Sequence, residues 1–495
     1  MSHIKRHIMK TSLIAMAAAA LALLAGCSLA PTYEHPGAPV MQTWPTGAAY
    51  KTADPGATAA AASNTPVSDL EWREFFIDER LRKVIALALA NNRDLRVSTL
   101  NIEKARAQYN IERAAYLPKL SASVSQTATR TPSTMTGSGE AAISRQYTGG
   151  LGIASYELDL FGKVRSLTEA GLQSYLGTEE ARRAAQISLV AEVANGYLTL
   201  MADQERLRLA QDTLKSQQTS YDLSKQRFKA GATSGLDMYD AQTSVETARS
   251  DVAVYTAQLA VDQNALTLLV GSVVPAELMP QGELAAVSKL APLPAGLPSE
   301  VLQRRPDVLE AERALIAANA NIGAARAAFF PSISLTASAG SASSTLSGLF
   351  KAGSSTWSFI PQISLPIFEG GVNRANLGIA KVNRDISVAQ YEKAIQAAFR
   401  EVADALAQNG TLDERMDAQQ ALVDASAKSF RIHEARYKKG AESYLDSLVS
   451  QRALYTAQQN LISARLTQAG NAVTLYKVLG GGWQPEAGLA TTGND

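Results

Sequence analysis

Two long stretches without proline limit the possible folds of this chain more than any other feature of its sequence. No proline occurs between Pro132 and Pro275, or between Pro366 and Pro485. Proline inside a helix removes a backbone hydrogen bond and clashes with the preceding turn, so these stretches permit unusually long helices. A helix over 163–229 would extend roughly 100 Å at 1.5 Å per residue, which is too long for a compact domain.

Apolar residues recur every seven positions within the first of these stretches. One series ends near residue 228 and a second begins ten positions later, so a turn is expected between two helices. Sustained heptads of this kind favour packing of long helices against one another, as in coiled coils. The two series are Val193, Leu200, Leu207, Leu214, Tyr221 and Phe228, followed by Met238, Val245, Val252, Leu259 and Leu266.

Four other segments alternate between apolar and small polar residues. This alternation predicts strands with one apolar and one polar face. The apolar face could cover the core of a soluble protein or face lipid on the outside of a membrane barrel, and the pattern leaves both readings open. The predicted strands span about 119–130, 145–161, 332–343 and 355–368.

The two halves of the chain repeat each other. The sequence RFKAGATSGLD at 227–237 corresponds to RYKKGAESYLD at 436–446, so Gly440 lies 209 positions (440 − 231) after Gly231. Each half therefore contains a helix, two strands, a long helix, a tight turn and a returning helix, which indicates a duplicated unit.

These boundaries predict the organisation of the whole chain. An extended arm rich in proline covers 27–77, and a short tail covers 481–495. The first repeat covers 78–297, with a long helix to 230 and a return helix over 236–271. The second covers 298–480, with a long helix to 439 and a return helix over 444–479.

If the four strands lie in a membrane, one chain cannot close a barrel alone. Single-chain membrane barrels have about eight strands or more, and an open edge in lipid leaves backbone groups unpaired. Three chains would supply twelve strands and close a symmetric ring.

The first 26 residues read as a cleaved secretion signal. Basic residues precede a short apolar stretch, which ends in Leu24-Ala25-Gly26-Cys27. This ending resembles the bacterial lipobox, in which the cysteine is acylated after cleavage. Cys27 is the only cysteine of the chain, and a free thiol beside an ordinary cleavage site is the alternative. Ser28 favours delivery of such a lipoprotein to the outer membrane.

Composition and motifs argue against an enzyme. The chain has 47 basic and 46 acidic residues, so no net field attracts nucleic acid. It has one cysteine and four histidines, two of which lie in the signal, so a metal site built on Cys or His is not expected. The sequence carries no P-loop and no nucleophile or zinc-protease motif. We expect no catalytic residue, metal or cofactor.

The sequence resembles the outer-membrane channel proteins of tripartite efflux pumps, in their lipoprotein branch. The resemblance covers nearly all of the mature chain and rests on RRPDV at 304–308, on SYELDLFGK at 155–163 and on the paired turns. It implies a mainly α-helical chain with membrane strands. Three chains would form a twelve-stranded barrel in the outer membrane, continued by a periplasmic helical barrel.

The resemblance also implies the function and the partners. The homotrimer would be a passive, gated exit duct that passes drugs or other small solutes from the periplasm to the outside. A periplasmic adaptor and an inner-membrane transporter, usually of the RND type, would complete the pump. Lipid of the outer membrane would surround the barrel and hold the acylated Cys27.

Two sets of site residues follow from the resemblance. The tips that contact the adaptor would comprise Arg227, Gly231, Ser234, Asp237, Arg436, Gly440 and Ser443. Ordinary turn chemistry also explains the glycines. The periplasmic aperture would comprise Tyr444, Leu445, Asp446 and Val449, although some family members carry an acid at the position of Val449. Asp446 is equally an ordinary first-turn residue favoured by the helix dipole.

Two other functions remain open at this point. A channel for type I protein secretion would share the fold, and a lipid-anchored periplasmic coiled-coil scaffold would share the anchor and the heptads. Trp72 and Trp357 read either as interfacial anchors or as core residues. His35 and His433 read as isolated residues with surface or packing roles.

Overall fold

The structure is a computed structural model that describes residues 29–41, 43–50, 70–137, 139–282, 284 and 299–481. The predicted signal peptide, Cys27 and the tail from 482 onward lie outside these described residues. Within them, no helix combines the length and the apolar character needed to cross a membrane.

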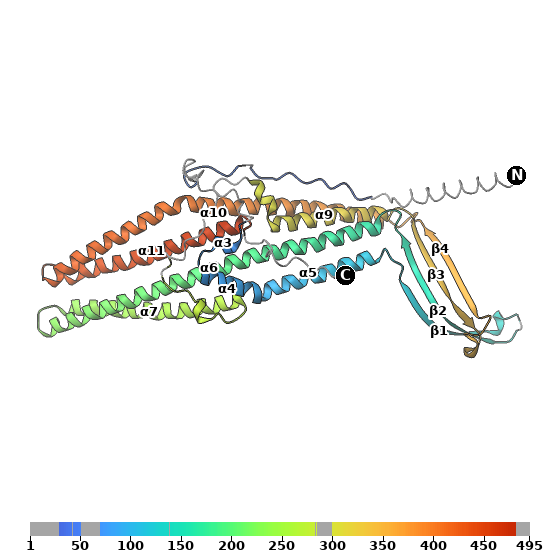
Figure 1. Ribbon diagram of the computed structural model, residues 1–495, viewed down its shortest axis with the longest axis horizontal. Helices are drawn as coiled ribbons and strands as arrows, with labels where there is room; N and C mark the ends of the chain where they lie inside the picture. The colour runs from blue at the N-terminus through green and yellow to red at the C-terminus, as the bar shows by residue number, and fades with distance from the viewer. Residues whose placement is uncertain are drawn as a thin grey trace. The chain divides into compact units, whose positions relative to one another are not determined.

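The first half of the chain contains short helices, two strands and one very long helical hairpin (Figure 1). Helix α6 runs without a break for 67 residues and turns back at once into α7. The elements are α3 (Trp72–Phe75), α4 (Glu79–Asn91), α5 (Arg93–Ala114), β1 (Leu120–Thr131), η2 (Ser133–Met135), β2 (Ala142–Leu158), α6 (Lys163–Lys229), α7 (Gly235–Val270) and η3 (Ala276–Leu278).

The second half repeats this order, with a helix, two strands and a second long hairpin. Helix α10 also has 67 residues and turns back into α11. The elements are η4 (Ser299–Arg304), α9 (Pro306–Ala327), β3 (Ser332–Ser343), η5 (Leu346–Gly348), β4 (Ser355–Ser364), α10 (Val372–Lys438) and α11 (Tyr444–Val478).

Three strand ends differ by three residues or more from the sequence-based expectation, and local chemistry explains two of them. Strand β2 ends at Leu158 rather than 161, because the Asp159 carboxylate accepts a hydrogen bond from the Arg165 backbone N–H at 2.8 Å and begins helix α6. Strand β4 ends at Ser364 rather than 368, where Pro366 has no N–H for the ladder. Strand β2 also begins three residues early, at Ala142.

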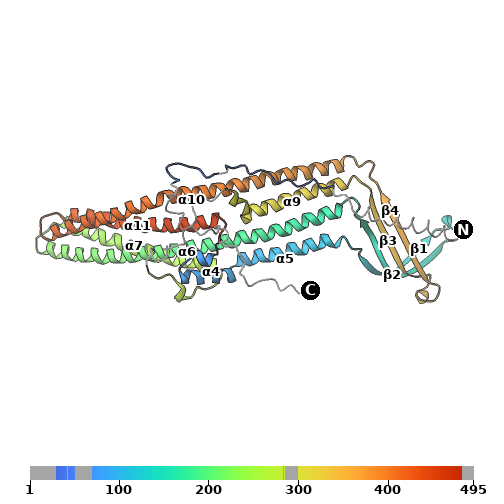
Figure 2. The same ribbon diagram turned by 45° about the horizontal axis from the view of Figure 1, so that its top comes forward.

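The described residues fall into two compact units, and each takes segments from both halves of the chain. One unit comprises the segment up to Gly37 with Ile102–Thr178 and Ala311–Tyr391, and it contains the sheet. The other comprises Ala38–Asn101, Glu179–Glu310 and the segment from Glu392, and it contains both hairpin turns. Figure 2 shows α7 beside α11 in this second unit, where the two helices are in contact.

The core of the second unit is aromatic and aliphatic. The Phe75 ring stacks on Tyr476 at a centroid distance of 4.1 Å, and the Tyr476 hydroxyl donates to the Leu70 carbonyl at 2.7 Å. Trp72 is 6% exposed, so it packs in this core, which settles the choice between core residue and anchor. Arg305 ties the core together, because its guanidinium reaches Asp307, Glu401 and the Val478 carbonyl at 2.6–3.0 Å.

In the first unit, the N-terminal arm docks on α9 and α10. Asn319 donates to the Pro31 carbonyl at 2.7 Å, and Tyr33 donates to Glu312 at 3.0 Å. The prediction that His35 is isolated is wrong, because its Nε2 lies 2.9 Å from the Tyr391 hydroxyl and 3.5 Å from Glu312. No local pattern predicts this contact, since residues 35 and 391 are brought together only by the fold.

Candidate functional site

The four strands form one antiparallel sheet in the order β1-β2-β3-β4 (Figure 1). Their register places apolar residues opposite each other through the middle of the sheet. Leu151 of β2 pairs with Ala122 of β1 and Ala339 of β3, and Ala339 pairs in turn with Trp357 of β4. The result is one continuous apolar face whose large side chains are exposed, including Leu120, Val124, Leu151, Trp357, Phe359 and Ile363.

The opposite face carries hydroxyl and amide side chains. Ser125 and Thr148 share a hydrogen bond at 2.7 Å across β1 and β2, and Ser338 and Ser358 share one at 2.8 Å across β3 and β4. Glu157 also lies on this face, where Lys163 holds its carboxylate at 3.1 Å. This side of the sheet is therefore suited to water.

A bulge in β2 explains the slip in its alternation. The register shifts between Ile153 and Tyr156, and Ser155 takes a positive φ of 49°. The Ser155 N–H donates to the Thr336 hydroxyl at 3.2 Å, so the extra residue keeps a partner. The bulge returns Tyr156 and Leu158 to the apolar face opposite Leu335 and Ile333.

The two outer strands leave the sheet open. Among the described residues, β1 pairs only with β2 and β4 pairs only with β3. Each outer strand therefore presents a row of backbone groups that a neighbouring strand can pair with.

The second candidate site is the pair of hairpin tips, where the predicted glycines end α6 and α10. Gly231 and Gly440 have φ of 70° and 75°, the left-handed region that suits glycine. The Ala232 N–H donates to the Arg227 carbonyl at 2.8 Å, and the Ala441 N–H donates to the Arg436 carbonyl at 2.9 Å. Both turns are therefore Schellman motifs, which end a helix while satisfying its last carbonyls.

The returning helices begin with matched caps. Ser234 and Ser443 each accept a hydrogen bond at 3.3 Å from the backbone N–H three residues later, at Asp237 and Asp446. The Ser443 hydroxyl also donates to the Asp446 carboxylate at 2.6 Å. Both aspartates thus lie in the first turn of a helix, where the dipole favours a negative charge.

Contacts between the two tips hold them together within one chain. The Arg227 guanidinium lies 5.0 Å from the centroid of the Tyr437 ring, a cation–π contact. Tyr437 packs in turn against Tyr444 at 5.4 Å. Tyr444 is 4% exposed and clusters with Ala241 and Leu448, so it belongs to the core of the tips.

The other predicted aperture residues are accessible. Leu445 is 55% exposed and Val449 is 57% exposed, and Asp446 is exposed between them in the sequence. The structure thus separates Tyr444, which supports the helix from behind, from three residues that face away from the tip core.

The sequence reasoning missed Glu442 at the second tip. Its carboxylate accepts from His433 Nδ1 at 2.8 Å and lies 3.2 Å from Arg436 Nε. The prediction that His433 is isolated is therefore wrong. The repeat gave no signal for this contact, because Thr233 stands at the corresponding position of the first tip and bonds to Asp237 instead.

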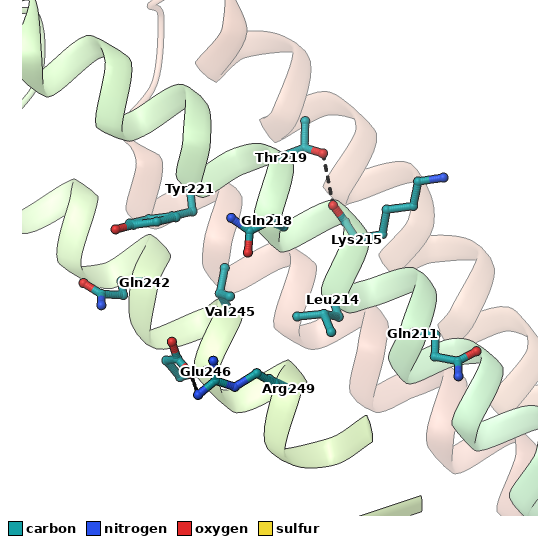
Figure 3. A pocket seen from close by; sticks show the side chains of 10 residues that line it. All are labelled: Gln211, Leu214, Lys215, Gln218, Thr219, Tyr221, Gln242, Val245, Glu246 and Arg249. Atoms are coloured by element: carbon teal, nitrogen blue, oxygen red, sulfur yellow. Dashed lines mark hydrogen bonds and ion pairs between the residues drawn. The ribbon is translucent and has the colours of Figure 1, made fainter. Parts of the chain in front are cut away.

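A groove runs along α6 and α7 a few turns from the first tip (Figure 3). Its volume is about 640 Å³. Leu214, Tyr221 and Val245 supply apolar surface, and an Arg249–Glu246 ion pair at 2.8 Å lies at the α7 side. Among the described residues, no group of three or more His, Cys, Asp or Glu side chains is placed to bind a metal.

Comparison with known proteins gives a consistent result. The sequence profile described as "Outer membrane efflux protein" matches residues 84–272 and 297–481. The chain is 50% identical over 482 residues to the probable efflux pump outer membrane protein TtgC of Pseudomonas putida, covering 97% of this chain and 98% of TtgC. It is 44% identical to the outer membrane protein OprJ of Pseudomonas aeruginosa, covering 93% and 94% of the two chains.

Solved structures share the fold. The open state of the MtrE outer membrane channel of Neisseria gonorrhoeae superposes with a TM-score of 0.82 at 40% identity, covering 92% of this chain and 99% of MtrE. A membrane protein from Pseudomonas aeruginosa gives a TM-score of 0.84 at 43% identity, covering 92% and 100%.

Proposed function

Because this chain belongs to the outer membrane efflux protein family, we propose that it forms the exit duct of a tripartite efflux pump of the RND type. The chain is an outer-membrane efflux channel that extends into the periplasm. Its fold is that of the trimeric channels, mainly α-helical with four membrane strands per chain. The family comprises channels, and we propose that this chain performs no chemistry of its own.

The two-faced open sheet carries the proposal. An exposed apolar face with Trp357 and Phe359 suits lipid, and the hydroxyl face suits a water-filled lumen. The open edges cannot be stable in a membrane unless β1 and β4 pair with other chains. Three copies of the sheet give twelve strands and satisfy every edge.

We propose that the cargo consists of small apolar or weakly polar solutes. Relatives are named for toluene and for antibiotic efflux, at 50% identity in both cases. The hydroxyl-rich face supports this assignment, since its carboxylate Glu157 is already paired with Lys163. A lumen of this kind passes neutral solutes without binding them through charge.

We propose that the tips contact a periplasmic adaptor. Their rigid Schellman turns and the cation–π contact between Arg227 and Tyr437 support a preformed docking end. The groove along α6 and α7 has the apolar floor and charged margin that suit a partner helix. The contact residues would be Arg227, Gly231, Ser234, Asp237, Arg436, Gly440 and Ser443.

We propose that Leu445, Asp446 and Val449 line the periplasmic aperture in the trimer, with Tyr444 supporting them from the core. Their exposure in one chain supports this role. Three copies of Asp446 around the axis would attract cations, and a ring of Leu445 or Val449 would resist wetting.

We also propose that Cys27 is acylated and that the chain divides into the repeats 78–297 and 298–480. The proposal that Cys27 is acylated is supported by the lipobox alone. The two separate matches of the family profile, at 84–272 and 297–481, support the division into repeats.

The mass of the detergent-solubilised particle tests the proposal. Light scattering corrected for bound detergent is expected to give three chains per particle, and the same particle is expected to conduct in planar bilayers. A one-chain particle without conductance would contradict the exit duct, because four strands cannot enclose a pore. A lipid-anchored scaffold would then be the better explanation.

A further inference from the structure

The loop end of the sheet carries basic side chains on the apolar face. Residues of β1 with even numbers share the face of Leu120 and Val124, so Arg130 lies on it. In β2, Arg145 shares the face of Tyr147 and Leu151. The register pairs Arg130 with Ile143 and Arg145 with Ala128, so the two arginines are diagonal neighbours across the two strands.

The β3–β4 connection folds onto the same face and carries a third cation, Lys351. A Cβ at Gly149 would lie 3.5 Å from the Phe350 ring and 3.6 Å from Leu349, on the side where Val124 projects. The connection therefore folds over the apolar face of β2. Lys351 follows directly and is exposed, and Phe350 is 78% exposed although Leu349 is buried.

These three cations have no acidic partner within the part of the chain that the structure describes. Among the described residues, no carboxylate oxygen lies within 4.0 Å of a side-chain nitrogen of Arg130, Arg145 or Lys351. One carboxylate, Glu140, lies in the β1–β2 connection, so the net charge of this end is positive. Cations without acidic partners thus lie at the end of the apolar face, which also carries the exposed Phe350 ring. Such a surface suits a ligand that has both an anionic group and an apolar part.

We propose that Arg130, Arg145 and Lys351 bind the phosphate-bearing headgroup of a lipid in the leaflet at the loop end of the sheet. The inference rests on the proposed membrane-spanning role of the sheet. Guanidinium groups bind phosphate through two parallel hydrogen bonds, and Phe350 contacts the upper part of the acyl chains. The site fixes the depth of the sheet in the membrane by charge as well as by apolar surface.

The test uses the purified full-length protein in nanodiscs of phosphatidylcholine supplemented with diphosphoryl lipid A. Native mass spectrometry measures the lipid A retained after release from the disc. We expect the R130A/R145A variant to bind it about twenty-five-fold more weakly, since each cation near a charged membrane surface strengthens binding by about a factor of five. R130K/R145K keeps the charges and should recover part of the binding. K119A removes a cation just before β1, at the opposite end of the sheet, and should bind as the wild type does.

Three results of the lipid measurement would overturn the inference. They are unchanged lipid retention in R130A/R145A, equal loss in K119A, or retention that persists when lipid A lacks its phosphates. A variant that loses its three-chain mass would also overturn it, because the arginines would then serve the contact between chains. Wild-type mass and conductance are measured on the same preparation. A failure of the exit duct itself would therefore show in the wild type, independently of the arginines.

Discussion

At the scale of single residues, the carboxyl group of Asp262 in the second unit is buried in a way that affects stability. Its Oδ2 is buried without a hydrogen-bond partner, and the buried Asp203 lies beside it on α6. Burial raises the pKa of Asp262 above its usual value, and the neighbouring Asp203 carboxyl raises it further. Arg206, 2.6 Å from Asp203, opposes this shift only in part.

The raised pKa gives a definite sign for the dependence of stability on pH. The folded chain holds the Asp262 proton more tightly than the unfolded chain does, so stability is lost as pH rises through the unfolded and then the folded pKa. We expect Asp262→Asn to remove this loss and to stabilise the helical unit by about 1 kcal/mol at neutral pH. Melting temperatures of the wild type and the variant, followed by tryptophan fluorescence from about pH 4, near the pKa of an unfolded aspartate, to about pH 8, measure it.

Asp222 provides the matched control. It accepts from Gln218 four residues earlier, as Asp262 accepts from Gln258, but it is exposed. Asp222→Asn should leave the pH dependence unchanged. If Asp262→Asn shows the same slope as the wild type, the raised pKa of Asp262 does not contribute to the pH dependence of stability.

At the scale of the elements, the hairpin tips depend on one glycine each. Gly440 has φ of 75°, and a Cβ there meets no neighbour, so the cost of Gly440→Ala is conformational. We expect a loss of about 1 kcal/mol, confined to the tip. Hydrogen exchange of the peptides around residues 436–446 should quicken, and that of the sheet should not.

Gly378, in the helix that precedes this turn, gives the opposite expectation. It lies in the interior of α10 without a positive φ, and nothing lies within 4 Å of its Cβ position. Alanine there should slow exchange slightly, because it is the better helix former. Equal effects of the two substitutions would mean that the turn conformation is not what Gly440 supplies.

Local periodicity and duplication made most of the elements predictable from the sequence. The heptad through Val193 and Leu200 marked a helix in which both residues are buried, and the alternation through Leu151 marked β2 together with its slip. Contacts between distant segments left no local signal. The His35–Tyr391 and His433–Glu442 contacts and the burial of Trp72 needed the fold to become visible.

At the scale of the whole molecule, the duplication allows two roles of an aspartate to be told apart: its charge at a helix N-terminus and its charge in the proposed aperture. Asp237 and Asp446 occupy the same position in the two repeats, and each backbone N–H is bonded to its cap serine at 3.3 Å. Replacing either aspartate with alanine removes the same favourable charge from a helix N-terminus, at a cost of about 0.5 kcal/mol. If the two variants differ in conductance or ion preference, the difference therefore comes from where each tip lies in the assembled channel.

We therefore expect Asp446→Ala to raise single-channel conductance in planar bilayers and to weaken the preference for cations, because three carboxylates leave the proposed aperture. Asp237→Ala should do neither, although it disturbs its own helix equally. If both variants raise conductance, loosening of the tips opens the channel and the charge is irrelevant. If neither does, the constriction lies elsewhere, and the exposed Leu445 and Val449 become the residues to vary next.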